Sequence, residues 1–238
     1  MDRIALGKTP SRTRRAVRGG RPAREFAGEV DARILDAARS VFFERGLAGA
    51  SMDEIAARAG AGKPTIYARF PNKEALFAAV VMRNVEAKIA QFQTYAPSGA
   101  SLEERLANAG SAVLQWILVG DTIGLVRLSI AEAPRFPDLA SSVGRMVRER
   151  GTEAVAQLLA EVARSDEPGP VPAFTPERLP AAARLFLDLI LLPLLIRALQ
   201  GAKLNELQAE IGPHVARSVA FFLAGCLHGG DESPKGRL

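Results

Sequence analysis

The chain has 238 residues, of which 48% are hydrophobic and 24% charged, a balance that is ordinary for a globular protein of one large or two small domains. Aromatic residues make up only 6%, and the abundance of Ala and Leu favours helices over sheets. Because Cys226 is the single cysteine, an internal disulfide is excluded, which fits a reducing compartment. Cys226 is predicted to be a buried, inert thiol.

The basic residues are concentrated at the N-terminus. Residues 1–27 contain eight Arg or Lys and two acidic residues, together with Gly and Pro and without helical periodicity, so we predict a flexible basic arm. Such an arm attracts any polyanion, which leaves nucleic acid and an anionic membrane surface as alternatives. No apolar run follows these charges, so a secretory signal is not indicated and we expect a cytoplasmic protein.

Helical periodicity begins at Val30, and Gly46 lies where a C-terminal cap would end the first helix. Two short helices follow, and then a long helix over about 73–94. Further helices are predicted at about 101–119, 121–133, 137–165, 175–200 and 204–228. No segment alternates polar and apolar residues over the length of a strand, so the predicted fold is all-α.

Residues 51–70 have the pattern of two short helices joined by a tight turn. Ser51 and Glu54 have the spacing of a capping box at the start of the first of them. Gly60 supplies the positive φ at which the chain reverses, and Pro64 suits the first turn of the second helix. A short helix that follows such a turn and presents Lys, Thr and Arg to solvent fits the major groove of DNA; an ordinary helical hairpin is the alternative.

Two residues near the end of this segment favour DNA. Tyr67 carries a hydroxyl on the second short helix, where it can reach a phosphate. Asn72 is a good N-cap for the long helix, so Lys73 falls in its first turn, where a cation opposes the helix dipole by roughly 0.3–1 kcal/mol. A bound phosphate would reverse that sign, because the amide ends and the lysine both attract it.

Residues 30–77 resemble the DNA-binding domain of the TetR family of transcriptional regulators, most closely over 62–77. The resemblance implies phosphate contacts from four of the residues at these positions and a lysine near the start of the recognition helix. The predicted DNA-binding residues are Ser51, Gly62, Lys63, Pro64, Thr65, Tyr67, Arg69 and Lys73, of which the four phosphate contacts are Ser51, Thr65, Tyr67 and Lys73. Family members often have a hydroxyl residue at 62, Gly at 64, an aromatic at 68 and His at 69, so these departures bear on which bases are read.

The same resemblance implies the organisation of the whole chain. A three-helix helix-turn-helix DNA-binding domain is expected at 28–88, after the arm, and a helical domain for effector binding and dimerisation at 89–238. The implied partners are a palindromic operator in double-stranded DNA, a small-molecule effector and a second copy of the chain, with no cofactor, metal or membrane. The run 127–138 is also similar to a stretch in one branch of TetR-like regulators.

In TetR-like proteins the last two long helices of each subunit pair into a four-helix bundle. Here the helix at 175–200 is apolar on nearly all sides and must be buried on nearly all sides, either in a dimer or as a central helix of one subunit. The predicted dimer residues are Leu185, Leu189, Leu192, Ile196, Ala216 and Ala220. Polar residues and a proline interrupt 185–199, which we expect to be too short and too polar to span a bilayer.

The candidates for an effector pocket are Phe92, Trp116, Arg127 and Met146. Trp116 falls on an apolar helical stripe, so plain core packing is the stronger alternative for it. Arg127 lies among apolar neighbours and either pairs with Glu132 or Asp121 or meets an anionic ligand.

Catalytic chemistry is not indicated by the residues available for it. The chain has two histidines fourteen residues apart and one cysteine, with no HExxH pattern, so neither a nucleophile with its base nor a ligand cluster is evident. The arm also lacks the leucine and aromatic face of an interfacial membrane helix. The sequence therefore predicts a ligand-responsive, DNA-binding repressor rather than a helical enzyme, a carrier or a membrane-surface protein.

Overall fold

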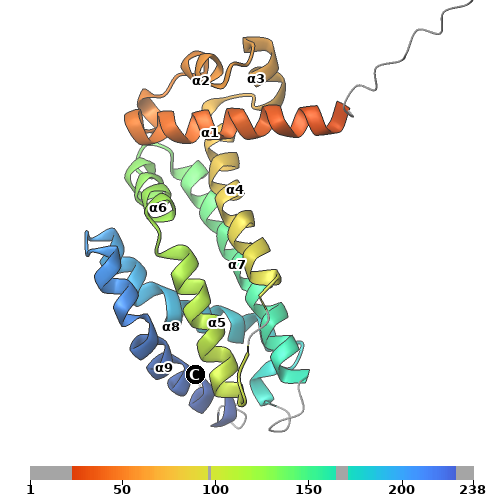
Figure 1. Ribbon diagram of the computed structural model, residues 1–238, viewed down its shortest axis with the longest axis vertical. Helices are drawn as coiled ribbons and strands as arrows, with labels where there is room; N and C mark the ends of the chain where they lie inside the picture. Colours follow the sequence, from red (N-terminus) through yellow and green to blue (C-terminus); the bar gives the residue numbers. More distant parts are fainter. Residues whose placement is uncertain (1–22, 96–97, 165–170, 229–238) are drawn as a thin grey trace, which may run out of the picture.

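The computed structural model describes residues 23–95, 98–164 and 171–228, which form nine α-helices and one 3₁₀ turn without any strand, so the all-α prediction is confirmed (Figure 1). The elements are α1 (Ala23–Gly49), α2 (Met52–Ala59), α3 (Lys63–Arg69), α4 (Lys73–Gln93), α5 (Leu102–Ile117), α6 (Gly120–Glu132), α7 (Pro137–Arg164), η1 (Pro172–Phe174), α8 (Leu179–Leu199) and α9 (Leu204–His228). Each predicted helix has its counterpart among them.

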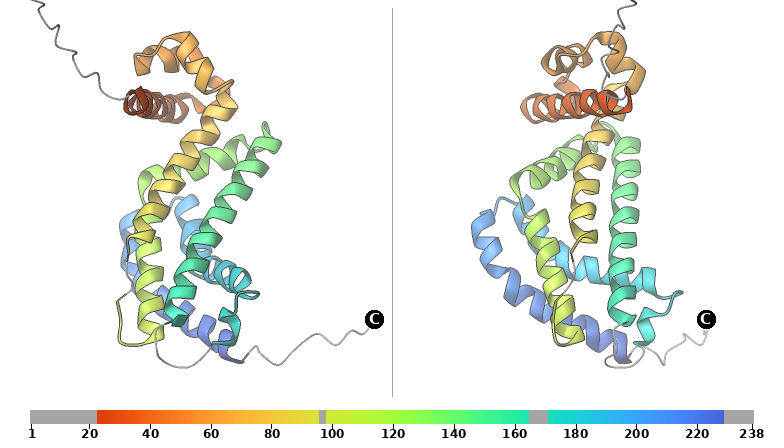
Figure 2. Two further views of the ribbon diagram at one scale, coloured as in Figure 1. Left: turned by 90° about the vertical axis from the view of Figure 1, so that its right-hand side faces the viewer. Right: turned by 45° about the vertical axis from the view of Figure 1, so that its right-hand side comes forward.

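The molecule is elongated, with helices α1, α2 and α3 at one end. Helix α1 lies across that end, α2 and α3 pack on its outer side, and α4 descends from α3 beside α7 (Figures 1 and 2). Helices α5, α8 and α9 form the opposite end together with the lower parts of α4 and α7. Helix α6 connects the two ends, because it packs against both α1 and α8.

Helix α1 begins earlier than the sequence pattern predicts. The expected basic arm covers 1–27, but the chain is helical from Ala23, since the Gly- and Pro-rich composition stops at Pro22 and the next five residues are mostly good helix formers. The rest of that arm lies outside the described residues. Gly46 adopts φ 69°, as its predicted capping position requires, but one further helical turn follows it and carries α1 to Gly49.

The start and the hydropathy of α8 also differ from expectation. The predicted helix at 175–200 begins only at Leu179, after the turn η1, because prolines at 172 and 176 interrupt the backbone hydrogen bonding there. The expectation that 185–199 is too short and too polar to span a bilayer does not hold for the whole of α8, of which that run is only a part. Helix α8 has 21 residues and a mean hydropathy of 2.0, which passes the test of length and composition, since its alanine-rich first turns extend the apolar run. Core helices of water-soluble proteins pass the same test, so this is weak evidence for a membrane span.

Two hydrophobic cores fill the molecule, and α4 contributes to both. Leu76 and Phe77 belong to the core beneath the short helices, whereas Ile89 and Phe92 belong to the core among the later helices. Val85 packs against both cores, so α4 runs without a break through the expected domain boundary at 88. The first core also takes side chains from α6 and α7, which means that the later part of the chain completes the packing of the helix-turn-helix region.

Candidate functional site

Helices α2 and α3 form the predicted helix-turn-helix. Gly60 ends α2 with φ 60° and ψ 33°, and its N–H bonds to carbonyls in the last turn of α2, so the chain reverses within three residues. Gly62 is the N-cap of α3, and Pro64 lies in its first turn, where a missing N–H donor is harmless. The local signals at the turn therefore act as predicted.

Ser51 is the N-cap of α2, but the capping box predicted with Glu54 is not formed. The Ser51 hydroxyl accepts an N–H, but from Asp53 at 3.3 Å. The Glu54 carboxylate accepts hydrogen bonds from Arg45 at 3.0 Å and from Arg58 at 3.2 Å, so it is engaged by guanidinium groups. Two arginines that compete for the same carboxylate explain why the return bond of the capping box is replaced.

Helix α3 is anchored by one face and exposed on the other. Ile66 is completely buried in the core shared with α1 and α2, and the half-buried Phe70 packs against that core at the helix end. Tyr67 is 49% exposed, and Gly62, Lys63, Pro64 and Ala68 are exposed as well. A seven-residue helix with this outward face has the dimensions of a major-groove reader.

Both cations of α3 are paired with carboxylates of neighbouring helices. Lys63 bonds to Asp53 of α2 at 2.6 Å, and this hydrogen bond raises the pKa of the lysine above its ordinary value. Arg69 is half-buried and bonds to Asp31 of α1, so it is turned partly inward and not fully outward as the sequence pattern predicts. A lysine has three donors and a guanidinium five, so each group keeps donors for DNA while its partner orients it.

Lys73 lies in the first turn of α4, next to the predicted cap. Asn72 accepts the N–H of Ala75 at 2.7 Å, which confirms it as the N-cap. The Lys73 ammonium is half-buried and donates to the carbonyl of Ala48 at 2.9 Å. Its position against the helix dipole is thus offset by a backbone acceptor, a partner that the sequence does not reveal because it lies 25 residues away.

The structure gathers the predicted DNA-binding residues around one end of the molecule but assigns them different environments. Those of α3 form one exposed face, with Thr65 and Arg69 half-buried at its edges. Ser51 and Lys73 flank the connection between α1 and α2, since Ser51 begins α2 and Lys73 bonds to Ala48. Sequence reasoning missed Asp31 and Asp53, which orient the two cations and have no local motif that could have identified them.

The four side chains predicted for an effector pocket lie in three separate environments. Phe92 and Trp116 contact each other edge to face at a centroid distance of 6.1 Å. Tyr95 also contacts Trp116 edge to face, at a centroid distance of 5.6 Å. Met146 instead packs against the core of the helix-turn-helix region. Only the aromatic pair is brought together, joined by a tyrosine that the sequence pattern did not single out.

Arg127 bonds to neither of its predicted carboxylate partners. Its guanidinium donates to the carbonyls of Ala198 at 2.5 Å and Leu199 at 3.3 Å, at the C-terminal end of α8, where the helix dipole favours a cation. Asp121 pairs with Arg39, and Glu132 accepts backbone N–H groups of α1. The prediction of an Arg127 ion pair with either residue is therefore wrong.

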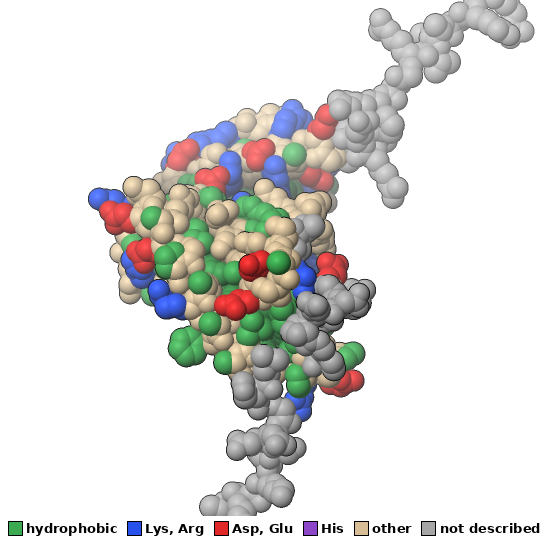
Figure 3. Space-filling view, turned by 60° about the horizontal axis from the view of Figure 1, so that its bottom comes forward, with side chains coloured by type: hydrophobic (Ala, Val, Ile, Leu, Met, Phe, Trp, Pro, Cys, Tyr) green, Lys and Arg blue, Asp and Glu red, His purple; other side chains and the backbone are tan. Residues whose placement is uncertain are grey.

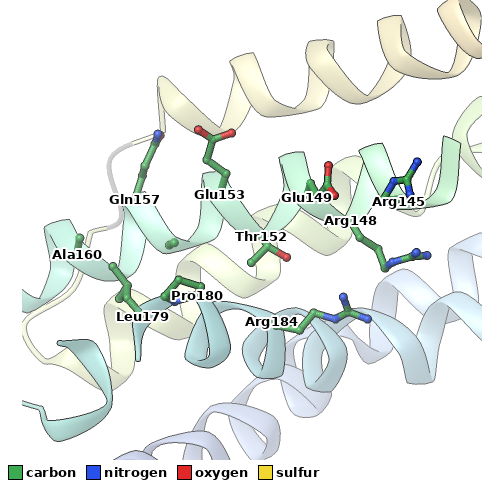
Figure 4. Close-up of a pocket in the computed structure, with 11 residues that line it drawn as sticks. Arg145, Arg148, Glu149, Thr152, Glu153, Gln157, Ala160, Leu179, Pro180 and Arg184 are labelled. Atoms are coloured by element: carbon green, nitrogen blue, oxygen red, sulfur yellow. The ribbon is translucent and has the colours of Figure 1, made fainter. Parts of the chain in front are cut away.

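An open groove of about 690 Å³ runs between α7 and α8. Figure 4 shows Arg148 of α7 and Arg184 of α8 extending toward each other across it. None of the predicted pocket residues lines this groove. Its lining residues are Arg145, Arg148, Glu149, Thr152, Glu153, Ala156, Gln157, Ala160, Leu179, Pro180 and Arg184.

Cys226 lies in the core of the C-terminal region near the end of α9. Burial raises the pKa of its thiol to about 11, so the thiolate is scarce at neutral pH. The prediction that this thiol is buried is confirmed, and its raised pKa agrees with the predicted low reactivity.

A helix-turn-helix with an exposed basic-polar recognition helix, carried on a longer helical domain, defines a DNA-binding transcription regulator. The family comparison agrees. A model described as "Bacterial regulatory proteins, tetR family" matches residues 34–80, and one described as "AefR-like transcriptional repressor, C-terminal domain" matches residues 104–225. The chain belongs to the TetR family.

Individual relatives resemble different lengths of the chain. The transcriptional activator FasR of Mycolicibacterium smegmatis is 32% identical over 143 residues, which are 60% of this chain and 63% of FasR, so the match spans less than two thirds of that relative. A TetR-family regulator from Mesorhizobium loti has 28% identity and a TM-score of 0.60, covering 83% of this chain and 96% of its own. The flavonoid-responsive regulator FrrA has 31% identity and a TM-score of 0.60, covering 88% and 100%.

Proposed function

We propose that the protein is a homodimeric repressor of the cytoplasm that binds a palindromic operator and is released by a small-molecule effector. The observation that carries this proposal is the uncovered apolar face of α8 and α9. Four large apolar side chains are exposed there: Leu185 (51%), Leu192 (44%), Ile196 (49%) and Phe221 (76%). Exposed apolar patches of this kind mark interaction surfaces.

The spacing of these residues supports a helix-pairing surface. Leu185, Leu192 and Ile196 are seven and four residues apart, so they share one side of α8. On α9, Ala216 and Ala220 are exposed at a spacing of four, a small-residue stripe that allows a second helix to approach closely. Figure 3 views the end of the molecule opposite the helix-turn-helix, where apolar side chains gather with some acidic ones among them, and Lys and Arg lie mainly toward the margins.

Helices α8 and α9 are joined to each other by more than apolar contact. Pro193 lies inside α8 and has no N–H to donate to the carbonyl of Leu189. The Ser218 hydroxyl of α9 donates to that carbonyl at 3.4 Å, and a ring N–H of His214 lies 2.9 Å from the carbonyl oxygen of Ile190. These bonds satisfy carbonyls near the proline, so the two helices present their outer faces as one surface.

A dimer also suits the way in which this fold reads DNA. One recognition helix contacts only a few base pairs, so useful specificity needs two helices about 34 Å apart or a multiple of that distance. An effector that favours a different separation of the two heads would weaken operator binding, by no more than its difference in affinity for the two states. FrrA, which is described as flavonoid-responsive, supports a ligand-responsive role, and the repressor description of the matched C-terminal domain supports the sign of the output.

The proposed DNA contacts are the residues of the helix-turn-helix region. Tyr67 and Thr65 on α3, with Ser51 and Lys73 beside it, supply hydroxyl and ammonium groups for phosphates. In this proposal Lys63 and the small residues Gly62 and Pro64 are exposed toward the DNA major groove, and Arg69 lies half-buried at the edge of the same face. The proposed effector contacts are Phe92 and Trp116, which already meet in the aromatic cluster.

The dimer is tested by charge in the apolar face. The double substitution Leu192→Glu with Ile196→Glu should give monomers by light scattering after gel filtration, because two buried carboxylates would oppose association. Operator affinity should fall by about 10²–10⁴-fold, the range that joining two binding modules provides.

A matched control is Ala90→Glu, which adds charge at an exposed position of α4 and should leave the dimer intact. A native monomer at micromolar concentration that binds a palindrome tightly contradicts the dimer. Flotation of the native protein with anionic vesicles, together with loss of flotation in the double variant, would assign the apolar face of α8 to a membrane instead.

A further inference from the structure

The C-terminal residue of α6 is bonded to the helix-turn-helix region. The carboxylate of Glu132 accepts the backbone N–H of Leu47 at 2.9 Å and that of Ala48 at 3.4 Å. These two N–H groups are available to Glu132 because α1 breaks at Gly46. The helical turn that follows the break therefore starts with N–H groups that have no partner within the helix. A carboxylate is well suited to such a helix start.

Gly46 and Glu132 fit each other. Gly46 has φ 69°, a conformation that side-chain-bearing residues rarely adopt. A Cβ added at Gly46 would lie 2.8 Å from Oε1 of Glu132, so the carboxylate occupies space that only glycine leaves open. The break in α1 and the approach of α6 are therefore a single arrangement.

The opposite side of the same peptide segment holds a predicted DNA contact. The carbonyl of Ala48 accepts a hydrogen bond from the ammonium of Lys73, while the N–H of Ala48 donates one to the carboxylate of Glu132. A change in the position of Glu132 thus moves the acceptor that orients Lys73. Glu132, Ala48 and Lys73 form a continuous chain of hydrogen bonds from the C-terminal domain to the DNA-binding end.

The bonds to Leu47 and Ala48 satisfy only one of the two carboxylate oxygens of Glu132. Its second carboxylate oxygen, Oε2, is buried and has no hydrogen-bond partner within the part of the chain that the structure describes. Burying part of a carboxylate without a partner opposes folding, so this contact is not explained as a stabilising one.

Helix α6 is also connected to the helices of the proposed dimer. Arg127, five residues before Glu132, donates to the carbonyls at the end of α8. A shift of α8 relative to α6 therefore acts on the helix that carries Glu132. The run 127–138, similar to a stretch in one branch of the family, contains both of these groups.

We propose that Glu132 is a positioning residue for DNA binding, which holds the turn after Gly46 and, through the carbonyl of Ala48, fixes the ammonium of Lys73 for a phosphate. This inference rests on the proposed phosphate contact of Lys73. In this proposal Glu132 transmits a displacement of α6 to the DNA-binding surface, although Glu132 itself touches no DNA.

The test is a double-mutant cycle on operator affinity with Glu132→Gln and Lys73→Ala in the full-length protein. Glu132→Gln keeps the shape and removes the charge, and it should weaken operator binding about tenfold, the scale of one hydrogen bond to a charged group. In the Lys73→Ala background the same change should weaken binding by less than about threefold, because coupled residues are not additive. Hydrogen exchange of a peptide covering 46–49 should be faster in Glu132→Gln with an unchanged melting temperature.

Asp121→Asn is the matched control, because it removes the charge from another polar link between α1 and α6, the ion pair to Arg39, without touching Ala48. Asp121→Asn should change operator affinity by the same factor in the native protein and in the Lys73→Ala background. An equal loss for Glu132→Gln in both backgrounds overturns the positioning role. A Lys73→Ala variant that binds normally shows instead that the proposed phosphate contact is wrong, which separates the two failures.

Discussion

The helix-turn-helix end and the C-terminal end of this protein hold their helices in different ways. Helices α2 and α3 have eight and seven residues, and they are fixed by caps, by the turn at Gly60 and by ion pairs to α1 and α2. Helices α7, α8 and α9 have 21 to 28 residues and are fixed mainly by apolar packing. The first end leaves Phe43 and Tyr67 exposed, at 42% and 49%, whereas the second exposes four large apolar side chains on α8 and α9, which are Leu185, Leu192, Ile196 and Phe221.

The difference indicates where each end needs a partner. The core of the helix-turn-helix region is completed by α6 and α7, with Leu125 and Val143 buried in it, and its outward face is polar and basic. The C-terminal core is also well filled, but α8 and α9 carry a second apolar face that the chain does not cover. The first surface suits a polyanion and the second suits another apolar surface.

The largest expected effects compare the two cores directly. Phe42 and Phe186 are both fully or almost fully buried, and each contacts another phenylalanine edge to face. Phe42→Ala and Phe186→Ala should each lower the free energy of unfolding by about 3–5 kcal/mol, the usual result of removing a buried aromatic ring. Thermal and urea unfolding measure this loss.

The two variants should differ in what else they lose. Phe42→Ala should abolish operator binding and leave the dimer intact, whereas Phe186→Ala should weaken both, since Phe186 lies on α8. Gel filtration with light scattering and an operator-binding assay distinguish the two cases. Dissociation of the dimer by Phe42→Ala would show that the cores, which share α4, unfold as one unit.

A smaller effect on DNA binding distinguishes the charge of Lys73 from the hydroxyl of Tyr67. Lys73→Ala should weaken binding to all sequences and reduce the slope of log affinity against log salt by about one, because one counterion fewer is released. Tyr67→Phe should also weaken binding but leave that slope unchanged, since a phenol carries no charge. Equal slopes for the native protein and Lys73→Ala would remove Lys73 from the set of phosphate contacts.

The sequence predicted the helix-turn-helix end well because its determinants are local. The positive φ at Gly60, the first-turn position of Pro64 and the cap at Asn72 each depend on a few neighbouring residues. Ile66 is fully buried, as the helical periodicity of this segment also requires. Helix boundaries followed for the same reason, apart from the early start of α1, its continuation past Gly46 to Gly49, and the late start of α8.

The long-range contacts could not be predicted in this way. Arg69 meets Asp31 from 38 residues away, and Glu132 meets Leu47 from 85, and no spacing rule connects such residues. Arg127 illustrates the point, since a cation among apolar neighbours suggested a carboxylate partner, while its acceptors are the carbonyls at the end of α8. The effector-pocket candidates show the same limit, because only Phe92 and Trp116 of the four are in contact.

The smallest expected effect compares one helix cap from each end. Asn72 caps α4, and Ser101 caps α5 by accepting the N–H of Glu104 at 3.1 Å while the Glu104 carboxylate accepts the N–H of Ala100 at 2.7 Å. Asn72→Ala and Ser101→Ala should each lower the free energy of unfolding by about 1 kcal/mol, the usual contribution of such a cap.

Operator binding should nevertheless separate these two variants. Asn72 precedes Lys73, so fraying of the first turn of α4 frees the lysine from its bond to Ala48 and lowers operator affinity a few-fold. Ser101 begins a helix whose packing is confined to the C-terminal core, so Ser101→Ala should leave affinity unchanged at temperatures well below the melting transition. Equal affinities for both variants would show that the first turn of α4 keeps its structure without the cap. The position of Lys73 would then depend on Ala48 and Glu132 alone.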